Sequence, residues 1–225
     1  MKNDKGLELW NKAAKRFIKQ QDENVLYNEL LKPKLSKLLH SRSFSSAMDA
    51  GCGTGAVSNE MWKLGATVEA FDPVADFISI AKMDFKGPNF TVGGFDTIYD
   101  SKFDVITCVN VLNNISSLEK PTAFFDKYCS NGGELIISIE HPFYTERETS
   151  YDSRYSDEFR YTSTFLGSDV PIHGWHRSLE RFCSYFFQYN FVIQQLHEIS
   201  ATPEDENVFQ KFGSGPFFMI IILTR

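Results

Sequence analysis

The stretch "AMDAGCGTGAVSNE" (residues 47–60) decides the fold of this 225-residue chain. It begins as a short apolar run, places Gly51, Gly53 and Gly55 within five positions, and continues with a helical pattern. A glycine cluster between a strand and a helix lets the backbone approach a ligand closely. The stretch therefore predicts a strand, a glycine turn and a helix, arranged as a ligand site.

The alternation of strand and helix continues along the chain. Helices are predicted from the glycine turn to Leu64, over residues 74–83, and from near Pro121 to "CSNGG", where Gly132 would supply the positive φ of a helix cap. This rhythm predicts a mostly parallel sheet with helices on both faces, and such sheets bind ligands beyond the carboxyl ends of their strands. The expected strands of this part are 45–50, 67–72, 89–92, 103–110 and 133–140.

The two ends of the chain have other patterns. Two amphipathic helices, over 7–20 and 24–39 with a kink at Pro33, precede the first strand. Residues 141–176 are polar and aromatic without clear periodicity, and a loop of this length inside a domain is usually functional, so we expect a lid. A helix over 177–189 follows, and then strands over 191–199 and "PFFMIIILTR" (216–225), with no helix between them and hence an antiparallel return.

Length and composition favour one domain, residues 1–225, with 42% hydrophobic residues for a full core. We divide it into a helical cap (1–44), a ligand-binding core (45–140), the lid insertion (141–176) and a C-terminal helix with two strands (177–225).

Charge and residue usage exclude several classes of protein. The net charge is −6 and no basic run is interleaved with aromatic residues, which argues against nucleic acid as a partner. No apolar run approaches the length of a membrane span, and the N-terminus lacks a signal core. The four cysteines form neither C-x-x-C nor a disulfide framework, which favours a cytoplasmic location. His173 and His176 are three residues apart without a third ligand at a sensible spacing, so no metal site is predicted.

The glycine cluster has two interpretations. From Gly51 to Ala56 it fits the G-x-G-x-x-[GA] pattern of dinucleotide sites, and from Asp49 it fits a D-x-G-x-G-x-G site for S-adenosylmethionine (SAM). Asp72 ends the second strand about 20 residues after the glycines, where a carboxylate holds the ribose hydroxyls of either cofactor. Asp72 could also only cap the helix that starts at Pro73. The glycines and Asp72 alone leave both cofactors open.

Three further features favour SAM. Asp49 precedes the first glycine at the strand tip, where a carboxylate suits a ligand that carries an ammonium and a sulfonium and would be awkward beside a pyrophosphate. Phe95 and Asp96 follow the third strand, and Asp96 can accept a hydrogen bond from the adenine amino group. The third feature is the return of the last two strands. No Tyr-x-x-x-Lys pair for hydride chemistry stands out in the sequence.

With "MDAGCGTG" (48–55), "GGFDTI" (93–98), "FDVITCVNVLNNI" (103–115), "NGGELIISIEHP" (131–142) and "GPFFMIIIL" (215–223) in this order, the chain resembles class I SAM-dependent methyltransferases of the small-molecule kind. The resemblance covers nearly the whole chain. It implies a Rossmann-like, doubly wound α/β fold whose seven-stranded, mostly parallel sheet has an antiparallel last strand. It also implies SAM as cofactor, S-adenosylhomocysteine (SAH) as product and a small-molecule acceptor.

The resemblance assigns roles to individual residues. The backbone of the glycine turn would line the methionine part, Asp72 would hold the ribose, Phe95 and Asp96 the adenine, and Asn110 with Val111 would face the sulfonium region. The full set of expected cofactor-binding residues is Asp49, Gly51, Cys52, Gly53, Asp72, Pro73, Phe95, Asp96, Asn110 and Val111.

No motif in the sequence marks the catalytic residues in the way that the glycine cluster marks the cofactor site. Methyl transfer is an in-line displacement that depends mainly on alignment, and a general base is an addition where the nucleophile carries a proton. Our candidates for a base or an acceptor contact are His141, Tyr144 and His176, each of which could instead be structural. The expected function is methyl transfer to O, N or C of a small molecule. The alternatives are a SAM-binding protein without methyl transfer and a nicotinamide-dependent oxidoreductase.

Overall fold

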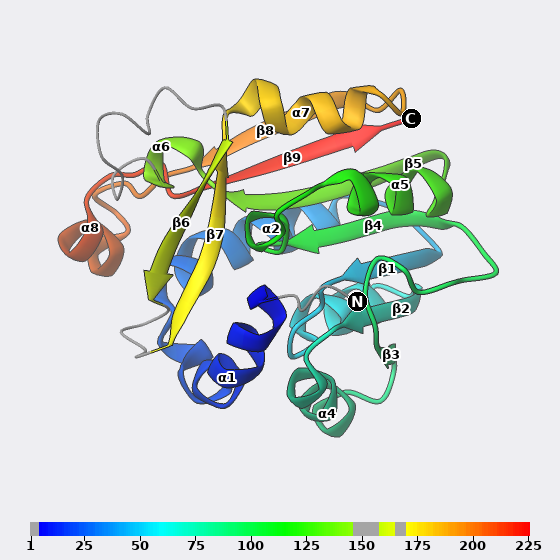
Figure 1. Cartoon of the computed structure of the whole chain (residues 1–225), viewed down its shortest axis with the longest axis horizontal. Helices are drawn as coiled ribbons and strands as arrows, with labels where there is room; N and C mark the ends of the chain where they lie inside the picture. The colour runs from blue at the N-terminus through cyan, green and yellow to red at the C-terminus, as the bar shows by residue number, and fades with distance from the viewer. Residues whose placement is uncertain (1–4, 146–157, 165–169) are drawn as a thin grey trace.

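A computed structural model of the chain describes residues 5–145, 158–164 and 170–225. Its main feature is a seven-stranded sheet in the order β3-β2-β1-β4-β5-β9-β8 (Figure 1). The first five strands pair in parallel, and β9 is antiparallel to both of its neighbours. The strands of this sheet are β1 (Ser46–Ala50), β2 (Thr67–Asp72), β3 (Asn89–Val92), β4 (Phe103–Val109), β5 (Cys129–Glu140), β8 (Val192–Ile199) and β9 (Phe218–Thr224). The predicted doubly wound sheet with an antiparallel last strand is confirmed.

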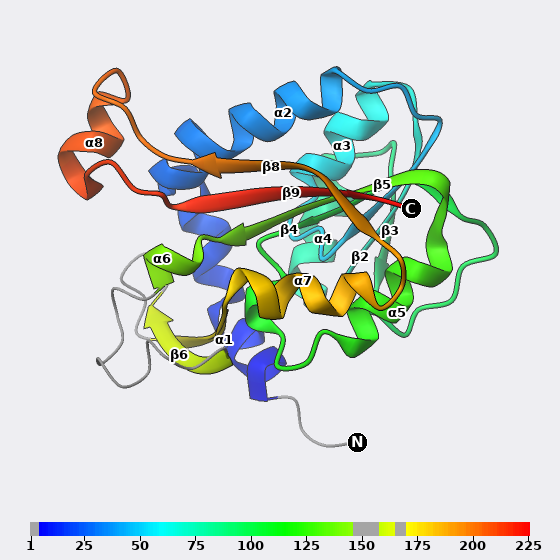
Figure 2. The same ribbon diagram turned by 90° about the horizontal axis from the view of Figure 1, so that it is seen from above.

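Helices cover both faces of the sheet. Figure 2 shows α2 and α3 on one side and α5 and α7 on the other. α3 starts directly after the glycine turn, as the sequence predicts, and α7 begins after Ser178, whose Oγ accepts a hydrogen bond from the N–H of Arg181 at 3.2 Å. Five of the helices after β1 are α3 (Ala56–Lys63), α4 (Ala75–Asp84), η3 (Leu112–Asn114), α5 (Glu119–Tyr128) and α7 (Leu179–Phe187).

The N-terminal segment is helical throughout most of its length. The predicted change of direction at Pro33 corresponds to a change from π-helical to α-helical geometry between Leu31 and Lys32. Proline has no N–H to donate four residues back, so a wider turn before it follows from its chemistry. The elements are α1 (Lys5–Gln20), η1 (Gln21–Glu23), η2 (Leu26–Leu31) and α2 (Lys32–His40).

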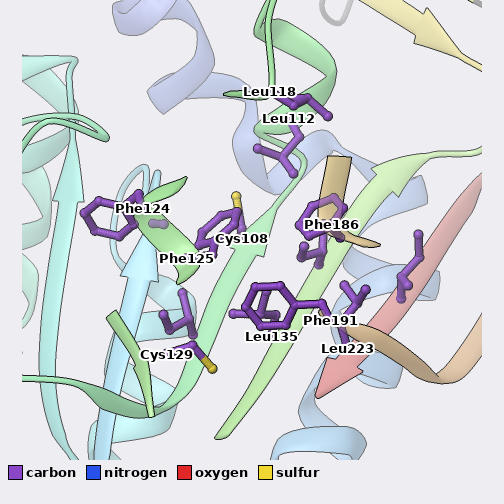
Figure 3. Packing of buried hydrophobic residues seen from close by; sticks show 14 of the residues in the cluster. Cys108, Leu112, Leu118, Phe124, Phe125, Cys129, Leu135, Phe186, Phe191 and Leu223 are labelled. Atoms are coloured by element: carbon purple, nitrogen blue, oxygen red, sulfur yellow. The ribbon is translucent and has the colours of Figure 1, made fainter. Parts of the chain in front are cut away.

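Two apolar layers hold the sheet between its helices. In β9, Met219, Ile221 and Leu223 pack with one cluster, and Ile220 and Ile222 pack with the other. A central strand that is buried on both faces must be apolar at every position, which explains the run "FMIII". On one face α5 and α7 meet through the stacked rings of Phe125 and Phe186, 6.3 Å apart (Figure 3). This packing fixes the strand ends that carry the polar residues of the site.

The insertion after β5 contains a β-hairpin that the sequence does not predict. A short helix, α6 (Pro142–Thr145), is followed by β6 (Glu158–Thr164) and β7 (Pro171–Arg177), which pair antiparallel as a separate two-stranded sheet. Figure 1 shows this hairpin across the carboxyl ends of β4 and β5. The remaining parts of the expected lid, 146–157 and 165–169, lie outside the described residues.

Two local predictions are wrong. Gly132 has a positive φ of 76°, but it lies inside β5 and not at a helix cap, because α5 ends at Tyr128 and the chain continues in extended form. The connection between β8 and β9 is not free of helix, since it contains α8 (Glu206–Phe212). That helix buries only Val208, so it leaves little periodicity in the sequence.

Candidate functional site

A cavity of about 1770 Å³ opens beyond the carboxyl ends of the parallel strands. Its walls come from α1 and η1, the glycine turn, the loops after β2, β3 and β4, the end of β5, and the β6–β7 hairpin. All ten residues that the sequence predicts for cofactor binding line this one cavity. The structure therefore brings together, in one place, residues spread from Asp49 to Val111.

The glycine turn requires glycine for two reasons. Gly51 has φ of 80°, and a Cβ on it would lie 2.4 Å from Cγ2 of Val111. Gly55 has φ of 86°, and a Cβ there would lie 2.7 Å from the ring of Phe90. Gly53 differs, because nothing lies within 4 Å of its added Cβ, which would project into open space. Gly51 and Gly55 are thus packed against neighbouring side chains, whereas Gly53 leaves the turn open toward the cavity.

Asp72 connects the tip of β2 to the glycine turn. One oxygen, Oδ2, accepts the N–H of Gly53 at 3.0 Å, and Oδ1 accepts the N–H of Val74 at 2.9 Å. The side chain therefore caps the segment before α4 and also lines the cavity. Burial raises the pKa of Asp72 to about 6, and its two backbone hydrogen bonds oppose that rise.

Asp49 lies beneath the glycine turn and is almost fully buried. Its carboxylate accepts the hydroxyl of Ser58 at 2.6 Å and the hydroxyl of Thr107 at 2.8 Å. Desolvation raises the pKa of Asp49, and the hydroxyl hydrogen bonds oppose the shift. Asp49 and Asp72 thus place two carboxyl groups at the cavity wall, which suits a cationic ligand.

Asn110 directly follows β4 and lies in the left-handed region, with φ of 55°. Its N–H donates to the carbonyl of Ser138 at 2.9 Å, and its Oδ1 accepts the hydroxyl of Ser138 at 2.9 Å. Asn is the residue that tolerates this conformation best after glycine. Asn110 and the following Val111 are therefore held against β5 at the edge of the cavity.

The turn after β3 carries Phe95 and Asp96. The ring of Phe95 packs edge-on against Phe71, Phe124 and Phe125 at centroid distances of 5.4–5.6 Å. Asp96 is exposed and lines the cavity beside it. This pair offers an apolar surface next to a carboxylate, which fits a planar ring with an amino group.

The N-terminal wall contains a contact that the sequence analysis missed. Thr54, in the glycine turn, donates its hydroxyl to Oε1 of Gln21 in η1 at 2.8 Å. Trp10 and Phe17 of α1 pack against Phe77 of α4, at centroid distances of 6.2 Å and 5.1 Å. The N-terminal helices are therefore fixed to the core beside the cavity.

The opposite wall contains a second missed group. Glu140, the last residue of β5, accepts the hydroxyl of Tyr161 from β6 at 2.5 Å. The N–H of Glu140 donates to Oδ1 of Asn113 at 3.2 Å, and all three residues line the cavity. Gly174 of β7 makes room for Tyr161, since a Cβ there would lie 2.2 Å from its ring. The position of Glu140 at a strand end was the only signal in the sequence.

The three residues predicted for catalysis are placed differently. His141 is buried, its Nδ1 accepts the N–H of Phe143, and its Nε2 lies 3.1 Å from Glu198. His176 is also buried, with its ring stacked on Phe159 at 4.4 Å. Among the residues described, neither histidine lines the cavity. The backbone of Tyr144 lies in α6, and its side chain is outside the described residues.

The described part of the chain shows neither a candidate metal cluster nor a helix that could span a membrane. No group of three or more His, Cys, Asp or Glu residues there could hold a metal ion. None of the helices in the same residues is long and apolar enough to cross a membrane.

Comparison with known proteins identifies relatives. A family model described as a methyltransferase domain matches residues 22–196. The chain is 29% identical over 123 residues to magnesium protoporphyrin IX methyltransferase of Arabidopsis thaliana, and 34% identical over 104 residues to ubiquinone biosynthesis O-methyltransferase of Schizosaccharomyces pombe. These matches cover 49% and 41% of this chain, but only 39% and 37% of the two relatives. The matched parts thus span less than half of either relative.

Solved structures share the fold over a larger part of the chain. A SAM-dependent methyltransferase from Mesorhizobium loti has a TM-score of 0.68 at 19% identity and covers 84% of this chain and 96% of its own. One from Clostridium acetobutylicum has a TM-score of 0.65 at 17% identity, with coverage of 96% and 98%. The N-methyltransferase NodS from Bradyrhizobium japonicum, solved with SAH, has a TM-score of 0.64 at 12% identity, with coverage of 95% and 96%. At these identities the likeness concerns the fold.

Proposed function

Because the chain belongs to the class I, Rossmann-like family of SAM-dependent methyltransferases, we propose that it transfers the methyl group of SAM to an oxygen or nitrogen atom of a small-molecule acceptor. The observation that carries the proposal is the convergence of ten cofactor-binding candidates on a single cavity, opposite a carboxylate and a tyrosine that no cofactor role requires.

The cavity fits SAM by the chemistry of its walls. The open face of Gly53 leaves room where a side chain would block the methionine part, and Asp72 presents a carboxylate that ribose hydroxyls can donate to. Asp49 and Asp72 supply negative charge for a ligand with an ammonium and a sulfonium. Phe95 and Asp96 complete an adenine site. A pyrophosphate would meet carboxylates here, which argues against the nicotinamide alternative.

When bound, SAM supplies an electrophilic methyl group on a good leaving group, so the protein has mainly to align and enclose the acceptor. The far wall carries the groups that do this. Glu140 can accept the hydrogen bond of an acceptor O–H or N–H and take up its proton during transfer. Tyr161 holds the carboxylate of Glu140 in place, and Trp175 adds an aromatic wall beside it. This arrangement favours oxygen and nitrogen nucleophiles over carbon.

Other features of the chain support a small-molecule acceptor in a reducing compartment. The net charge of −6 disfavours a polyanionic partner. All four cysteines are free thiols, which supports a cytoplasmic location.

The test is release of SAH from SAM in the presence of an acceptor panel of phenols, catechols, primary amines and carboxylic acids. We expect turnover with one of the O–H or N–H classes, reduced at least a hundredfold in Glu140→Gln. Tight binding of SAM without turnover on any member of a broad panel would instead favour a SAM-binding protein that does not transfer methyl groups.

A further inference from the structure

The buried guanidinium of Arg177 joins two walls of the cavity. Arg177 is the last residue of β7, at the base of the hairpin, and its side chain is 3% exposed. Its N–H groups donate to the backbone carbonyls of Leu112 (3.3 Å), Ile115 (2.6 Å) and Ser116 (3.2 Å). Glu158, at the start of β6, supplies the counter-charge at 2.9 Å. One side chain thus binds three carbonyls of a single segment.

That segment, residues 111–116, forms the cavity wall directly after β4. Five of its members line the cavity: Val111, Asn113, Asn114, Ile115 and Ser116. It is fixed at its start by the bonds between Asn110 and Ser138, and near its middle by the bond between Asn113 and Glu140. Its last two residues, Ile115 and Ser116, are held to the hairpin by the hydrogen bonds from Arg177 to their carbonyls.

We propose that Arg177 is a positioning residue that couples the β6–β7 hairpin to segment 111–116, so that the cofactor side and the acceptor side of the cavity are ordered together. The proposal rests on the proposed function in one respect, that SAM and SAH bind beside Asn110 and Val111. Binding at one wall then stabilises the other, and the coupling is reciprocal.

Arginine is suited to this role and lysine is not. The planar guanidinium has five N–H donors in a fixed fork, so it can span several carbonyls and a carboxylate at once. A lysine ammonium is a point charge on a flexible stem and reaches fewer of them. Burial of the guanidinium charge costs free energy, which the bonds to Glu158 and the three carbonyls offset. Replacing Arg177 leaves these acceptors without their donor, so we expect a strong effect on this part of the structure.

Arg181 provides a matched control. It also contacts Glu158, at 3.4 Å, but its side chain is 48% exposed and its other partner is the hydroxyl of Tyr185 at 3.1 Å. It shares the counter-charge of Arg177 without contacting segment 111–116 in the described structure. If loss of a positive charge beside Glu158 lowers SAH affinity by itself, both Arg177→Met and Arg181→Met will show the fall. If the coupling is responsible, only Arg177→Met will show it.

The experiment measures SAH affinity by calorimetry and hydrogen exchange of peptides 111–118 and 171–177, in the wild type, Arg177→Met, Arg177→Lys and Arg181→Met. We expect SAH affinity to fall at least tenfold in Arg177→Met and at least threefold in Arg177→Lys, and to stay within twofold in Arg181→Met. We also expect SAH to slow hydrogen exchange of peptide 171–177 in the wild type and to leave it unchanged in Arg177→Met.

The proposal is overturned if folded Arg177→Met and Arg177→Lys bind SAH like the wild type. It is also overturned if SAH slows hydrogen exchange of peptide 171–177 as much in Arg177→Met as in the wild type. If Arg177→Met does not fold, Arg177→Lys decides alone by the same criteria. If the wild type does not bind SAH, the proposed function fails, and exchange of 111–118 without ligand decides: faster exchange in Arg177→Lys supports the coupling, and unchanged exchange overturns it.

Discussion

Asp72 accepts the backbone N–H of Gly53 at 3.0 Å, so the end of β2 and the glycine turn form one unit. Burial removes the carboxylate from water and raises its pKa to about 6, and the bond from Gly53 opposes that rise because it stabilises the ionised form. The same bond holds Gly53 with its open face toward the cavity.

This relationship predicts a pH-dependent affinity. Ribose hydroxyls prefer the ionised carboxylate, so protonation of Asp72 below pH 6 competes with the cofactor. Between pH 8 and pH 5 the dissociation constant of SAH should rise about tenfold, since at pH 5 only about one molecule in eleven keeps the ionised form. Calorimetry at a series of pH values checks this.

The control for the pH series is Asp72→Asn, which does not titrate and should bind SAH weakly with a flat profile through this range.

The raised pKa of Asp72 also makes the stability of the protein depend on pH, with a defined sign. The folded state binds the proton more tightly than the unfolded state, so the free energy of unfolding without ligand falls by on the order of 3 kcal/mol as pH rises from about 3 to 7, most of it between pH 4 and 6. An equally steep profile in Asp72→Asn would assign the effect to other groups, such as Asp49.

The glycine turn predicts a second result. Gly51→Ala combines a positive φ with a Cβ that would lie 2.4 Å from Val111, so we expect a loss of at least about 2 kcal/mol of stability. Denaturant titration measures the loss. Adding Val111→Ala should recover the steric part only.

Gly53→Ala is the matched comparison for Gly51→Ala. With nothing within 4 Å of its Cβ, it should cost only the ~1 kcal/mol of the left-handed backbone, while SAH affinity falls because the methyl group enters the cavity. Equal stability losses in the two variants would contradict the packing described for the turn.

The contact between Tyr161 and Glu140 predicts a loss of turnover without a loss of SAH affinity, because Arg177 still joins the hairpin to segment 111–116 when this contact is broken. Gly174→Ala would place a methyl group 2.2 Å from the ring of Tyr161 and move its hydroxyl away from Glu140. We expect kcat with an accepted substrate to fall at least tenfold while SAH affinity stays within twofold. Tyr161→Phe keeps the ring but lacks the hydroxyl, and should show the same loss of kcat. A fall in SAH affinity with kcat unchanged would contradict this role of Tyr161.

His141 and His176 allow a test of the catalytic residues expected from the sequence. Because both side chains are buried and neither lines the cavity in the described structure, His141→Gln and His176→Gln should lower the melting temperature and change kcat less than tenfold. A hundredfold or larger loss of kcat in a stably folded variant would show that one of them acts in the reaction, as the sequence analysis predicts.

The sequence predicted the sheet and brought the ten cofactor-binding candidates to one cavity for the same physical reason. Strands buried on both faces are continuous apolar runs, and their carboxyl ends meet at one edge, so Asp49, Asp72, Asp96 and Asn110 could be placed from the alternation alone. The glycines added the position of the turn.

The opposite wall, formed by Glu140 and the hairpin, could not be predicted in the same way. Tyr161 meets Glu140 only because β6 pairs with β7 and the hairpin returns over the end of β5, a non-local arrangement in a polar segment. Arg177 likewise finds its partners more than 60 residues away, at Ile115 and Ser116. Both contacts depend on side chains crossing between elements, which periodicity does not encode.

Calorimetric titration of the wild type and Asp72→Ala with SAH determines whether this cavity is a SAM site. We expect one SAH bound per chain in the wild type and at least a hundredfold weaker binding in Asp72→Ala. No binding to the wild type, or the same affinity in Asp72→Ala, would contradict this expectation.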